Sequence, residues 1–372
     1  MRALLIALVL IGFSNLQAKD MSVPAKRIDP ASVGELFDNG DSNLMIKAIN
    51  RQLRAFKRRS LSGTLDIGGD QFPMNSMKDT AIHFKSLWQK RNLCLSSGVD
   101  RRCHEKFKQA MRDDFYWYTP AVGGITQAHF TGYYSPTFKA HRTPTQNFQY
   151  GLYKLPPIAD RSFSRNEILF DQRLEGKGLE LFYMNDPFEL FLLHVEGGGV
   201  VEVEENGIEK SYFLSYAGTN SQRFSFIGGY MLEKGYITDP SVKSQRAFLK
   251  NNPSKWREIY AQTPSYVYLK ITKTEPLGME NIPLTPGRSM AQDRSIYWRK
   301  GLMGFATAKI PDYSRGVGYQ KQMNRFFVDQ DTGGAIKGEA RADLYWGYGS
   351  KAQFLAENMD DYGDLFFFVK KP

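Results

Sequence analysis

From about Phe115 onward, the chain consists of short aromatic and β-branched runs separated by Gly, Pro, Asn and Asp. Such runs fit a pleated, half-buried surface and the separating residues fit turns, so the pattern is typical of sheets and barrels. Leu181–Met184 and Phe188–Val195 flank an Asn-Asp-Pro turn and are expected to be a pair of strands. Strands are also expected at Ser265–Leu269 and Phe366–Val369. The pattern predicts a mainly β protein.

The first third of the chain and one later segment have a helical pattern instead. Apolar residues recur at near-helical spacing in two early runs, about Leu44–Phe56 and Asn75–Leu93. A third helical region covers about Ser221–Tyr260 and is expected to include a helix cap at Asp239. We expect the apolar stripes to be core and the basic residues beside the first stripe to form a solvated face.

Two acids, Asp331 and Asp343, lie twelve positions apart and are joined by a segment that contains Gly333 and Gly334. Adjacent glycines let a backbone approach a ligand or another strand closely. Asp343 interrupts an otherwise apolar run, so its carboxyl is expected to be partly desolvated, which favours the protonated form that a general acid needs. The alternative is that both acids are ordinary turn residues.

The first residues resemble a secretory signal peptide. A basic start at Arg2 precedes an uncharged, mostly aliphatic run, Ala3–Phe13, and a small residue, Ala18, after which cleavage is expected. The run is shorter than the roughly 20 apolar residues that span a bilayer. With no cysteine beside the cleavage site for a lipid, we expect an exported, periplasmic protein, with association with the outer membrane as an alternative.

The net charge, the cysteines and the histidines indicate which partners, cross-links and metal sites to expect. The net charge of +10 suits an anionic partner such as an acidic polysaccharide or a membrane surface, and export makes nucleic acid the least expected partner. Cys94 and Cys103 are expected to form a short-loop disulfide in an oxidising compartment, with two free thiols as the alternative. The five histidines have no metal-ligand spacing, so neither a metal nor a cofactor is expected.

Seven motifs, each weak alone, occur in one order along the chain. They are Phe130–Pro136 (FTGYYSP), His194–Gly199 (HVEGGG), Ser215–Asn220 (SYAGTN), Thr263–Tyr268 (TPSYVY), Pro283–Arg288, Asp293–Ile296 and the segment with Asp331 and Asp343. Together they resemble the membrane-bound lytic murein transglycosylase A (MltA) family, including its C-terminal module named for three aspartates (3D). The resemblance covers nearly two thirds of the chain.

The resemblance implies a double-psi β-barrel domain and a second, inserted β domain, with a groove between them that holds a glycan strand. Residues 1–18 would be the signal peptide, and residues 19–136 a helical segment followed by the first part of the barrel. Residues 137–262 would form the inserted, MltA-specific domain. Residues 263–372 would complete the barrel as its 3D part.

The resemblance also implies a peptidoglycan lytic exotransglycosylase that acts in cell-wall turnover and remodelling. Such an enzyme cleaves the β-1,4 bond between N-acetylmuramic acid and N-acetylglucosamine without water and leaves a 1,6-anhydromuramoyl end. Most glycosidases use two carboxyl groups. Here the C6 hydroxyl of the substrate is the nucleophile, so one carboxyl can act first as acid and then as base. Asp343 matches the family's catalytic aspartate.

Two other functions remain as alternatives. The first is a lysozyme-like peptidoglycan hydrolase that uses Asp343 together with Glu196 or Asp331. The second is a protein that binds peptidoglycan without cutting it. The expected partners are glycan strands and other cell-wall enzymes, and the chain is expected to be a monomer.

The resemblance assigns the remaining site residues. Asp331 and Asp293 match the other two of the three aspartates, either as supporting acids or as structural hydrogen-bond acceptors. Glu196 stands where family members often have Gln, and the Asp331–Asp343 segment is one residue longer than the family pattern. Asn220 is a weaker candidate, with capping of the following helix as its alternative. The candidates for substrate binding are Thr131, Gly132, Tyr133, Tyr134, Glu196, Gly197, Gly198, Tyr216, Gly218 and Lys337.

Overall fold

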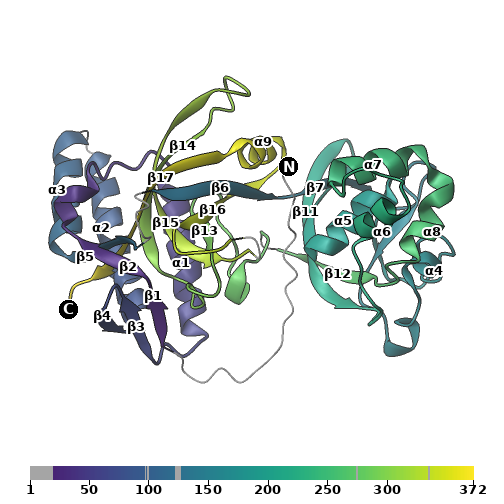
Figure 1. Cartoon of the computed structure of the whole chain (residues 1–372), viewed down its shortest axis with the longest axis horizontal. Helices are drawn as coiled ribbons and strands as arrows, with labels where there is room; N and C mark the ends of the chain where they lie inside the picture. Colours follow the sequence, from purple (N-terminus) through teal and green to yellow (C-terminus); the bar gives the residue numbers. More distant parts are fainter. Residues whose placement is uncertain (1–19, 97, 99, 122–126, 274, 334–335) are drawn as a thin grey trace. The chain divides into compact units, whose positions relative to one another are not determined.

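The computed structural model describes residues 20–96, 98, 100–121, 127–273, 275–333 and 336–372, so the expected signal peptide lies outside the described residues. The described residues form two compact units (Figure 1). One, the inserted unit, is Pro136–Pro276; the other, the barrel unit, combines the described residues from 20 to 135 with Leu277–Pro372. The chain returns to the barrel unit later than residue 263 because Val267–Thr272 still pairs in the sheet of the inserted unit.

The barrel unit is built on a closed six-stranded barrel. Its strands pair in the order β14-β15-β13-β16-β6-β17, and β17 pairs with β14 to close the ring. The strands are β6 (Ala128–Ser135), β13 (Ser289–Gln292), β14 (Met303–Pro311), β15 (Gln320–Asp331), β16 (Arg341–Tyr348) and β17 (Asp360–Lys370). Two pairs are parallel, β13 with β15 and β16 with β6. Closure leaves no free edge within the ring, and β6 supplies its only strand from before the inserted unit.

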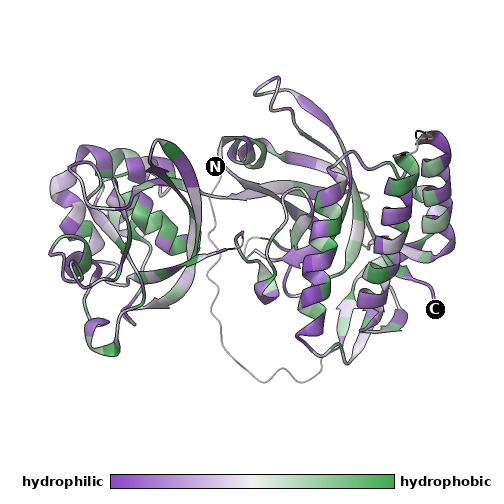
Figure 2. Ribbon diagram, turned by 180° about the vertical axis from the view of Figure 1, so that it is seen from behind, coloured by the Kyte–Doolittle hydropathy of each residue, from purple (hydrophilic) through white to green (hydrophobic). Residues whose placement is uncertain are grey.

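Other elements of the barrel unit surround this ring. Strand β5 (Phe115–Pro120) pairs with β17 and then with β2 (Ala25–Ile28), while β1 (Met21–Val23), β3 (Thr64–Ile67) and β4 (Asp70–Pro73) form a small separate sheet. The helices are α1 (Ser42–Lys57), α2 (Ser76–Leu95), α3 (Asp100–Asp113) and α9 (Ser350–Asn358), with 3-10 turns at Pro30–Val33 and Met279–Asn281. Figure 2 shows hydrophilic and hydrophobic residues alternating along these helices.

The two early helices that the apolar spacing predicts are confirmed as α1 and α2. Asp41 caps α1, since its carboxylate accepts hydrogen bonds from the backbone N–H groups of Asn43 and Leu44. The apolar face of α2 enters an aromatic core in which the Phe84 ring lies 5.6 Å from Trp88 and 5.0 Å from Phe326 of β15. This packing fixes α2 to the barrel wall.

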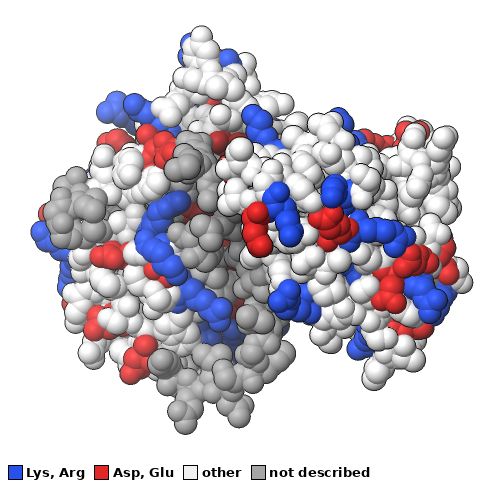
Figure 3. All heavy atoms as spheres, turned by 45° about the vertical axis from the view of Figure 1, so that its right-hand side comes forward, with Lys and Arg blue, Asp and Glu red and all other residues white. Residues whose placement is uncertain are grey.

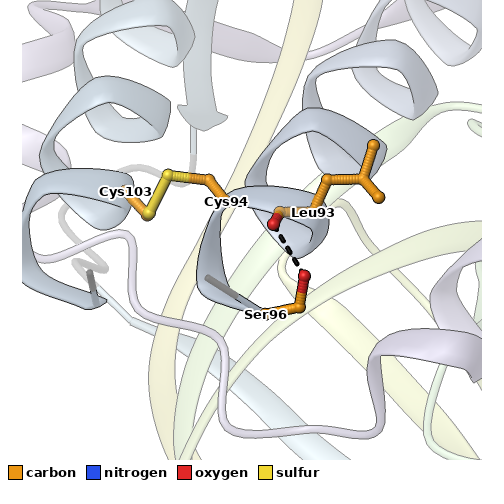
Figure 4. Close-up of a disulfide and its surroundings, with 4 residues drawn as sticks. All are labelled: Leu93, Cys94, Ser96 and Cys103. Atoms are coloured by element: carbon orange, nitrogen blue, oxygen red, sulfur yellow. Dashed lines mark hydrogen bonds between the residues drawn. A yellow bond between two sulfur atoms is a disulfide. The ribbon is translucent and has the colours of Figure 1, made fainter. Parts of the chain in front are cut away.

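Cys94 and Cys103 form a disulfide that joins the last turn of α2 to α3 (Figure 4). Their Cα atoms are 5.7 Å apart. In the same turn, the Ser96 hydroxyl donates a hydrogen bond of 2.7 Å to the carbonyl of Leu93. The end of α2 is therefore held both covalently and by hydrogen bonding.

The inserted unit has one six-stranded sheet with helices packed on it. The strand order is β12-β11-β10-β7-β9-β8. Its strands are β7 (Thr137–His141), β8 (Tyr150–Tyr153), β9 (Glu180–Met184), β10 (Gly198–Glu205), β11 (Ile208–Thr219) and β12 (Val267–Thr272). Its helices are α4 (Arg165–Leu169), α5 (Pro187–Glu196), α6 (Ile227–Glu233), α7 (Val242–Asn251) and α8 (Trp256–Tyr260), with 3-10 turns at Ile158–Asp160 and Pro253–Lys255. On its visible face, Figure 3 shows basic and acidic side chains side by side.

One strand prediction in this unit is wrong. Leu181–Met184 lies in β9 as expected, but Phe188–Val195 is helical and forms most of α5. Asp186 caps the helix by accepting a hydrogen bond of 2.7 Å from the Phe188 N–H, and Pro187 occupies its first turn. Gly197 ends it in the left-handed conformation. Residues of α5 are buried in two different apolar clusters, so almost every position of the run is apolar. Such a run has no alternation of polar and apolar residues, and its sequence therefore does not distinguish a helix from a strand.

The helical region expected between Ser221 and Tyr260 is confirmed and contains three short helices. The N-cap residue of α7, however, lies two residues later in the sequence than predicted. Ser241, not Asp239, is the N-cap residue of α7, and its hydroxyl accepts a hydrogen bond of 3.2 Å from the Ser244 N–H. Asp239 instead accepts a hydrogen bond of 3.0 Å from the Ser241 N–H. It therefore shapes the turn that precedes the helix.

The overall fold class is confirmed as mainly β with helical segments. In the described ranges, no helix is long and apolar enough to cross a membrane.

Candidate active site

Two of the three aspartates are brought together by the register of four neighbouring barrel strands. Asp331 on β15 lies opposite Ala291 on β13, Ala291 lies opposite Asp343 on β16, and Asp343 lies opposite Thr131 on β6. Residues in one row across a sheet are close neighbours. Strand pairing therefore places residues from distant parts of the chain in one row across the barrel wall.

The Asp343 carboxylate is held through one of its oxygens. The Thr131 hydroxyl donates a short hydrogen bond to Oδ1, and Nη1 of Arg341 donates to the same oxygen at 2.6 Å. Arg341 also donates to the Thr131 hydroxyl oxygen at 2.8 Å, which closes a three-membered cluster. Among the residues that the structure describes, none donates a hydrogen bond to Oδ2 of Asp343. The side chains of Arg341 and Asp343 are 22% and 20% exposed, so the cluster reaches solvent.

Sequence reasoning missed Arg341. The sequence could have indicated it, because residues two apart on a strand point to the same face, and Arg341 precedes Asp343 by two positions. The prediction that the Asp343 carboxyl is desolvated considered only the apolar residues next to it in sequence and not the guanidinium of Arg341. A charge partner favours the ionised form of a carboxyl, whereas burial favours the protonated form. The site therefore combines partial burial with a cation at contact distance.

Asp331 has a different environment, since both of its oxygens accept hydrogen bonds. The Tyr133 hydroxyl donates to Oδ2 at 2.7 Å, and the backbone N–H of Met279 donates to Oδ1 at 3.1 Å. Burial raises the pKa of Asp331, although these hydrogen bonds oppose the rise. Burial also raises the pKa of Tyr133 well above its usual value, so the hydroxyl stays a neutral donor. Asp331 is thus a half-buried acceptor beside the Asp343 cluster.

Asp293 ties two loops together next to β13. One oxygen accepts hydrogen bonds from the Ser295 N–H at 2.9 Å and from its hydroxyl at 2.8 Å. The other accepts from the N–H of Gly338 at 2.8 Å. Burial acts to raise the pKa of Asp293, but the hydrogen bonds from Ser295 and Gly338 outweigh it, so the pKa lies below its ordinary value. Asp293 is an ionised anchor for the loop that leads into β16.

Gly132 allows β6 to approach its neighbours closely. A Cβ atom at this position would lie 2.6 Å from Nε1 of Trp346 and 3.0 Å from the Cα of Ala356, so a larger residue would displace the strand. Tyr134 is half-buried on the same strand, and Lys337 is exposed in the loop before β16. Of the predicted Gly333-Gly334 turn, Gly334 lies outside the described residues.

The other five candidates belong to the inserted unit, three of them where α5 passes into β10. Glu196 is the last residue of α5, and although its side chain is exposed, desolvation by the surrounding protein raises its pKa. Gly197 has a φ of 71°, which a residue with a Cβ rarely adopts. A Cβ on Gly198 would lie 2.4 Å from the Leu214 carbonyl oxygen. Both glycines are therefore needed by the backbone itself.

The last two candidates lie on β11. Tyr216 is 48% exposed. Gly218 lies against Leu155, whose Cδ1 would be 2.7 Å from an added Cβ. The weaker candidate Asn220 is buried, and its amide donates to the carbonyls of Phe163 at 2.8 Å and Pro264 at 2.9 Å. The suggestion that Asn220 caps the next helix is wrong, because α6 begins only at Ile227.

Two family descriptions match the chain. The MltA specific insert domain matches residues 159–270, and the 3D domain matches residues 288–369. The membrane-bound lytic murein transglycosylase A of Escherichia coli K12 is 31% identical over 260 residues, which cover 69% of each chain. This chain belongs to the MltA family. The MltA insert match lies inside the inserted unit, and the 3D match runs from the start of β13 to the end of β17.

Other relatives agree with this membership. The membrane-bound lytic murein transglycosylase A of Vibrio cholerae is 32% identical over 249 residues, which cover 65% of this chain and 66% of that protein, slightly less than two thirds of its length. The crystal structure of E. coli MltA with bound chitohexaose has a TM-score of 0.63 at 24% identity and covers 95% of this chain and 97% of that one. At that identity the likeness establishes the MltA fold alone.

Proposed function

We propose that this MltA-family protein is a lytic transglycosylase that cleaves the β-1,4 glycosidic bond of peptidoglycan without water. The proposal is supported by the names of its relatives, lytic murein transglycosylases, and by the chitohexaose-bound member of the same fold, since chitohexaose is a β-1,4-linked amino-sugar chain. A signal peptide would carry the protein out of the cytoplasm to this polymer. We further propose that it acts there as a monomer and works beside other cell-wall enzymes.

Asp343 is the proposed acid and base. Its carboxyl protonates the glycosidic oxygen while the bond from that oxygen to C1 of the muramoyl sugar breaks. The C6 hydroxyl of the same sugar then bonds to C1, and its proton passes to the Asp343 carboxylate, which restores the acid. No water is consumed and no second carboxyl is needed. Arg341 and Thr131 stabilise the carboxylate that exists between the two proton transfers.

The observation that carries this assignment is the contrast among the three aspartates. Asp331 and Asp293 use both oxygens as hydrogen-bond acceptors for the protein, whereas Asp343 uses only Oδ1 for the described residues that surround it. Oδ2 of Asp343 is therefore the oxygen best suited to exchange a proton with a ligand. Asp331 and Asp293 are supporting acids that hold the site.

One observation favours the hydrolase as a second candidate. Glu196 is an exposed carboxyl whose pKa is raised by desolvation, and a raised pKa favours the protonated form that a general acid needs. A hydrolase would need a second carboxyl group in addition to Asp343, so the two functions differ in their products.

The test is to incubate the protein without residues 1–18 with purified peptidoglycan sacculi and to analyse the soluble products by mass spectrometry. Products lighter by one water than hydrolytic muropeptides are expected, and products with free reducing ends would reject the proposal in favour of the hydrolase. Asp343→Asn should lower turnover by at least about a hundredfold. Asp171→Asn, which removes an exposed carboxyl of the inserted unit, is the matched control and should leave turnover unchanged. Unchanged turnover in Asp343→Asn would reject that residue as the acid.

A further inference from the structure

A cleft lies between α1 and α2 in the barrel unit, with a volume of 780 Å³. None of its lining residues belongs to the three-aspartate site. The lining contains three cations, all from α1, together with four carboxamide side chains, two from each helix, and no acidic residue. Such a surface is complementary to a ligand that carries both carboxylates and amide groups.

The positive charge of α1 is not balanced within the helix. Lys47, Arg51 and Arg54 are spaced four and three residues apart, which places them as neighbours on one side. None of the residues Ser42–Lys57 that form α1 is acidic. Like charges at these spacings repel and destabilise a helix.

Arg51 differs from the other two cations of the cleft because its side chain is buried and held by hydrogen bonds. Its side chain is 5% exposed, and its Nη1 donates to the Leu284 carbonyl at 2.6 Å and to the Thr285 hydroxyl at 3.0 Å. These contacts hold the guanidinium in one orientation, so binding costs little of its conformational entropy. The exposed Lys47 and Arg54 flank it on the rim.

The opposite wall is also fixed. Leu93 in the last turn of α2 and Ser96, the residue that follows the helix, contribute to the lining. The Cys94–Cys103 disulfide and the Ser96–Leu93 hydrogen bond hold this end of the helix in place (Figure 4). Leu93 is 73% exposed, which leaves an apolar side chain on a polar rim. An aliphatic part of a ligand could cover it.

We propose that this cleft binds the carboxylated stem peptides of peptidoglycan, and this inference rests on the proposed function. A stem peptide carries free carboxylates for the cations, amide groups for the carboxamides and aliphatic carbons for Leu93. The cleft would then hold the enzyme to the peptide-bearing wall independently of the glycan at Asp343. A lipid headgroup offers the negative charge but not the repeated amide groups.

The test measures binding to insoluble sacculi with their stem peptides and to sacculi stripped of peptides by an amidase. All proteins carry Asp343→Asn so that they bind without cutting. Lys47→Gln/Arg54→Gln removes the two rim cations, and Lys243→Gln/Lys250→Gln removes two exposed cations of α7 as the matched control. We expect the cleft variant to lose about fivefold in affinity for peptide-bearing sacculi only. The control should bind like the parent protein.

An equal affinity of the cleft variant and the control, or an equal loss on both kinds of sacculi, would overturn the proposal. Loss of binding to phosphatidylglycerol vesicles with unchanged binding to sacculi would also overturn it, in favour of a membrane surface. Analysis of the reaction products distinguishes a failure of this binding proposal from a failure of the proposed function. With Asp343 restored, the cleft variant should still release anhydro products from stripped glycan, and failure of the unsubstituted protein to do so would reject the activity instead.

Discussion

The Asp343 carboxylate shares one oxygen between Arg341 and Thr131, and these two side chains also contact each other. A closed cluster of this kind restricts the rotation of the carboxyl group and aims its other oxygen. Arg341 is therefore a positioning residue in the proposed reaction. Its guanidinium also compensates the charge that appears on Asp343 after the first proton transfer.

This role predicts a specific kinetic effect. Arg341→Met should lower kcat by about ten- to a hundredfold with little change in KM, because the lost contact acts on the transition state rather than on substrate binding. Arg341→Lys should recover part of the rate, since it restores a cation without the fixed geometry of the guanidinium. Steady-state kinetics on solubilised glycan strands measures both. A rise in KM alone would mean that Arg341 binds substrate and does not position Asp343.

The raised pKa of Asp331 leads us to expect that the free energy of unfolding depends on pH. Burial raises its folded-state pKa above the ordinary value of 3.8, so the native protein keeps a proton that the unfolded chain has already released. Its contribution to stability is therefore fully present below the ordinary pKa and is lost as the pH rises through the raised folded pKa.

Asp331→Asn should abolish this part of the pH dependence, because an amide does not titrate. We expect the free energy of unfolding of the variant to fall less than that of the parent protein as the pH rises above 3.8. Urea denaturation at a series of pH values measures it, with Asp171→Asn as the control that keeps the parent slope. Identical slopes in all three proteins would show that Asp331 has no raised pKa.

At the scale of elements, the disulfide joins two helices that are near neighbours in sequence. The cysteines are nine residues apart, so the cross-link closes a short loop and constrains the unfolded chain only moderately. It acts where α2 and α3 pack together, and the Trp88 and Phe107 rings lie 5.7 Å apart across that contact. The bond and the aromatic packing therefore stabilise the same helix pair.

Replacing both cysteines by serine should lower the free energy of unfolding by about 2 to 3 kcal/mol, the entropy that a loop of this length recovers in the unfolded state. Chemical denaturation of the oxidised parent, the reduced parent and the double variant measures the effect. The reduced parent and the variant are expected to agree. A loss confined to the variant would point to the serines themselves and not to the missing bond.

At the scale of the whole molecule, the barrel unit is assembled from two chain segments while the inserted unit is continuous. The inserted unit contains its own six-stranded sheet and its own buried clusters, including Leu152, Phe182, Leu193 and Tyr266. The barrel ring, in contrast, needs β6 from before the insertion and five strands from after it.

This difference predicts that the two units depend differently on chain continuity. Residues 136–276 expressed alone should fold and unfold in one cooperative transition, because a core of this size is sufficient for an independent domain. Residues 277–372 alone should show no such transition, since the ring would remain open at β6. Thermal denaturation followed by circular dichroism measures both. Cooperative unfolding of the C-terminal fragment would contradict the requirement for β6.

The sequence by itself determined the features that depend on local patterns. The apolar period located α1 and α2, turn residues and aromatic runs indicated a mainly β fold, and the ordered motifs identified the family before any geometry was known. These features follow from helix and strand periods and from turn chemistry, which act over a few residues. The aspartates were likewise recognisable because each lies in a short motif.

Tertiary structure decided what local patterns leave open. Phe188–Val195 became a helix because its caps and its burial on both faces overrode an ambiguous apolar run. Arg341, Thr131 and Asp343 became one cluster only because β6 and β16 pair in parallel across more than two hundred residues of sequence. Which aspartate keeps an oxygen for a ligand depends on Tyr133, Met279, Ser295 and Gly338, which the fold brings to Asp331 and Asp293. Such contacts arise from strand register and closure of the barrel, and no short segment contains them.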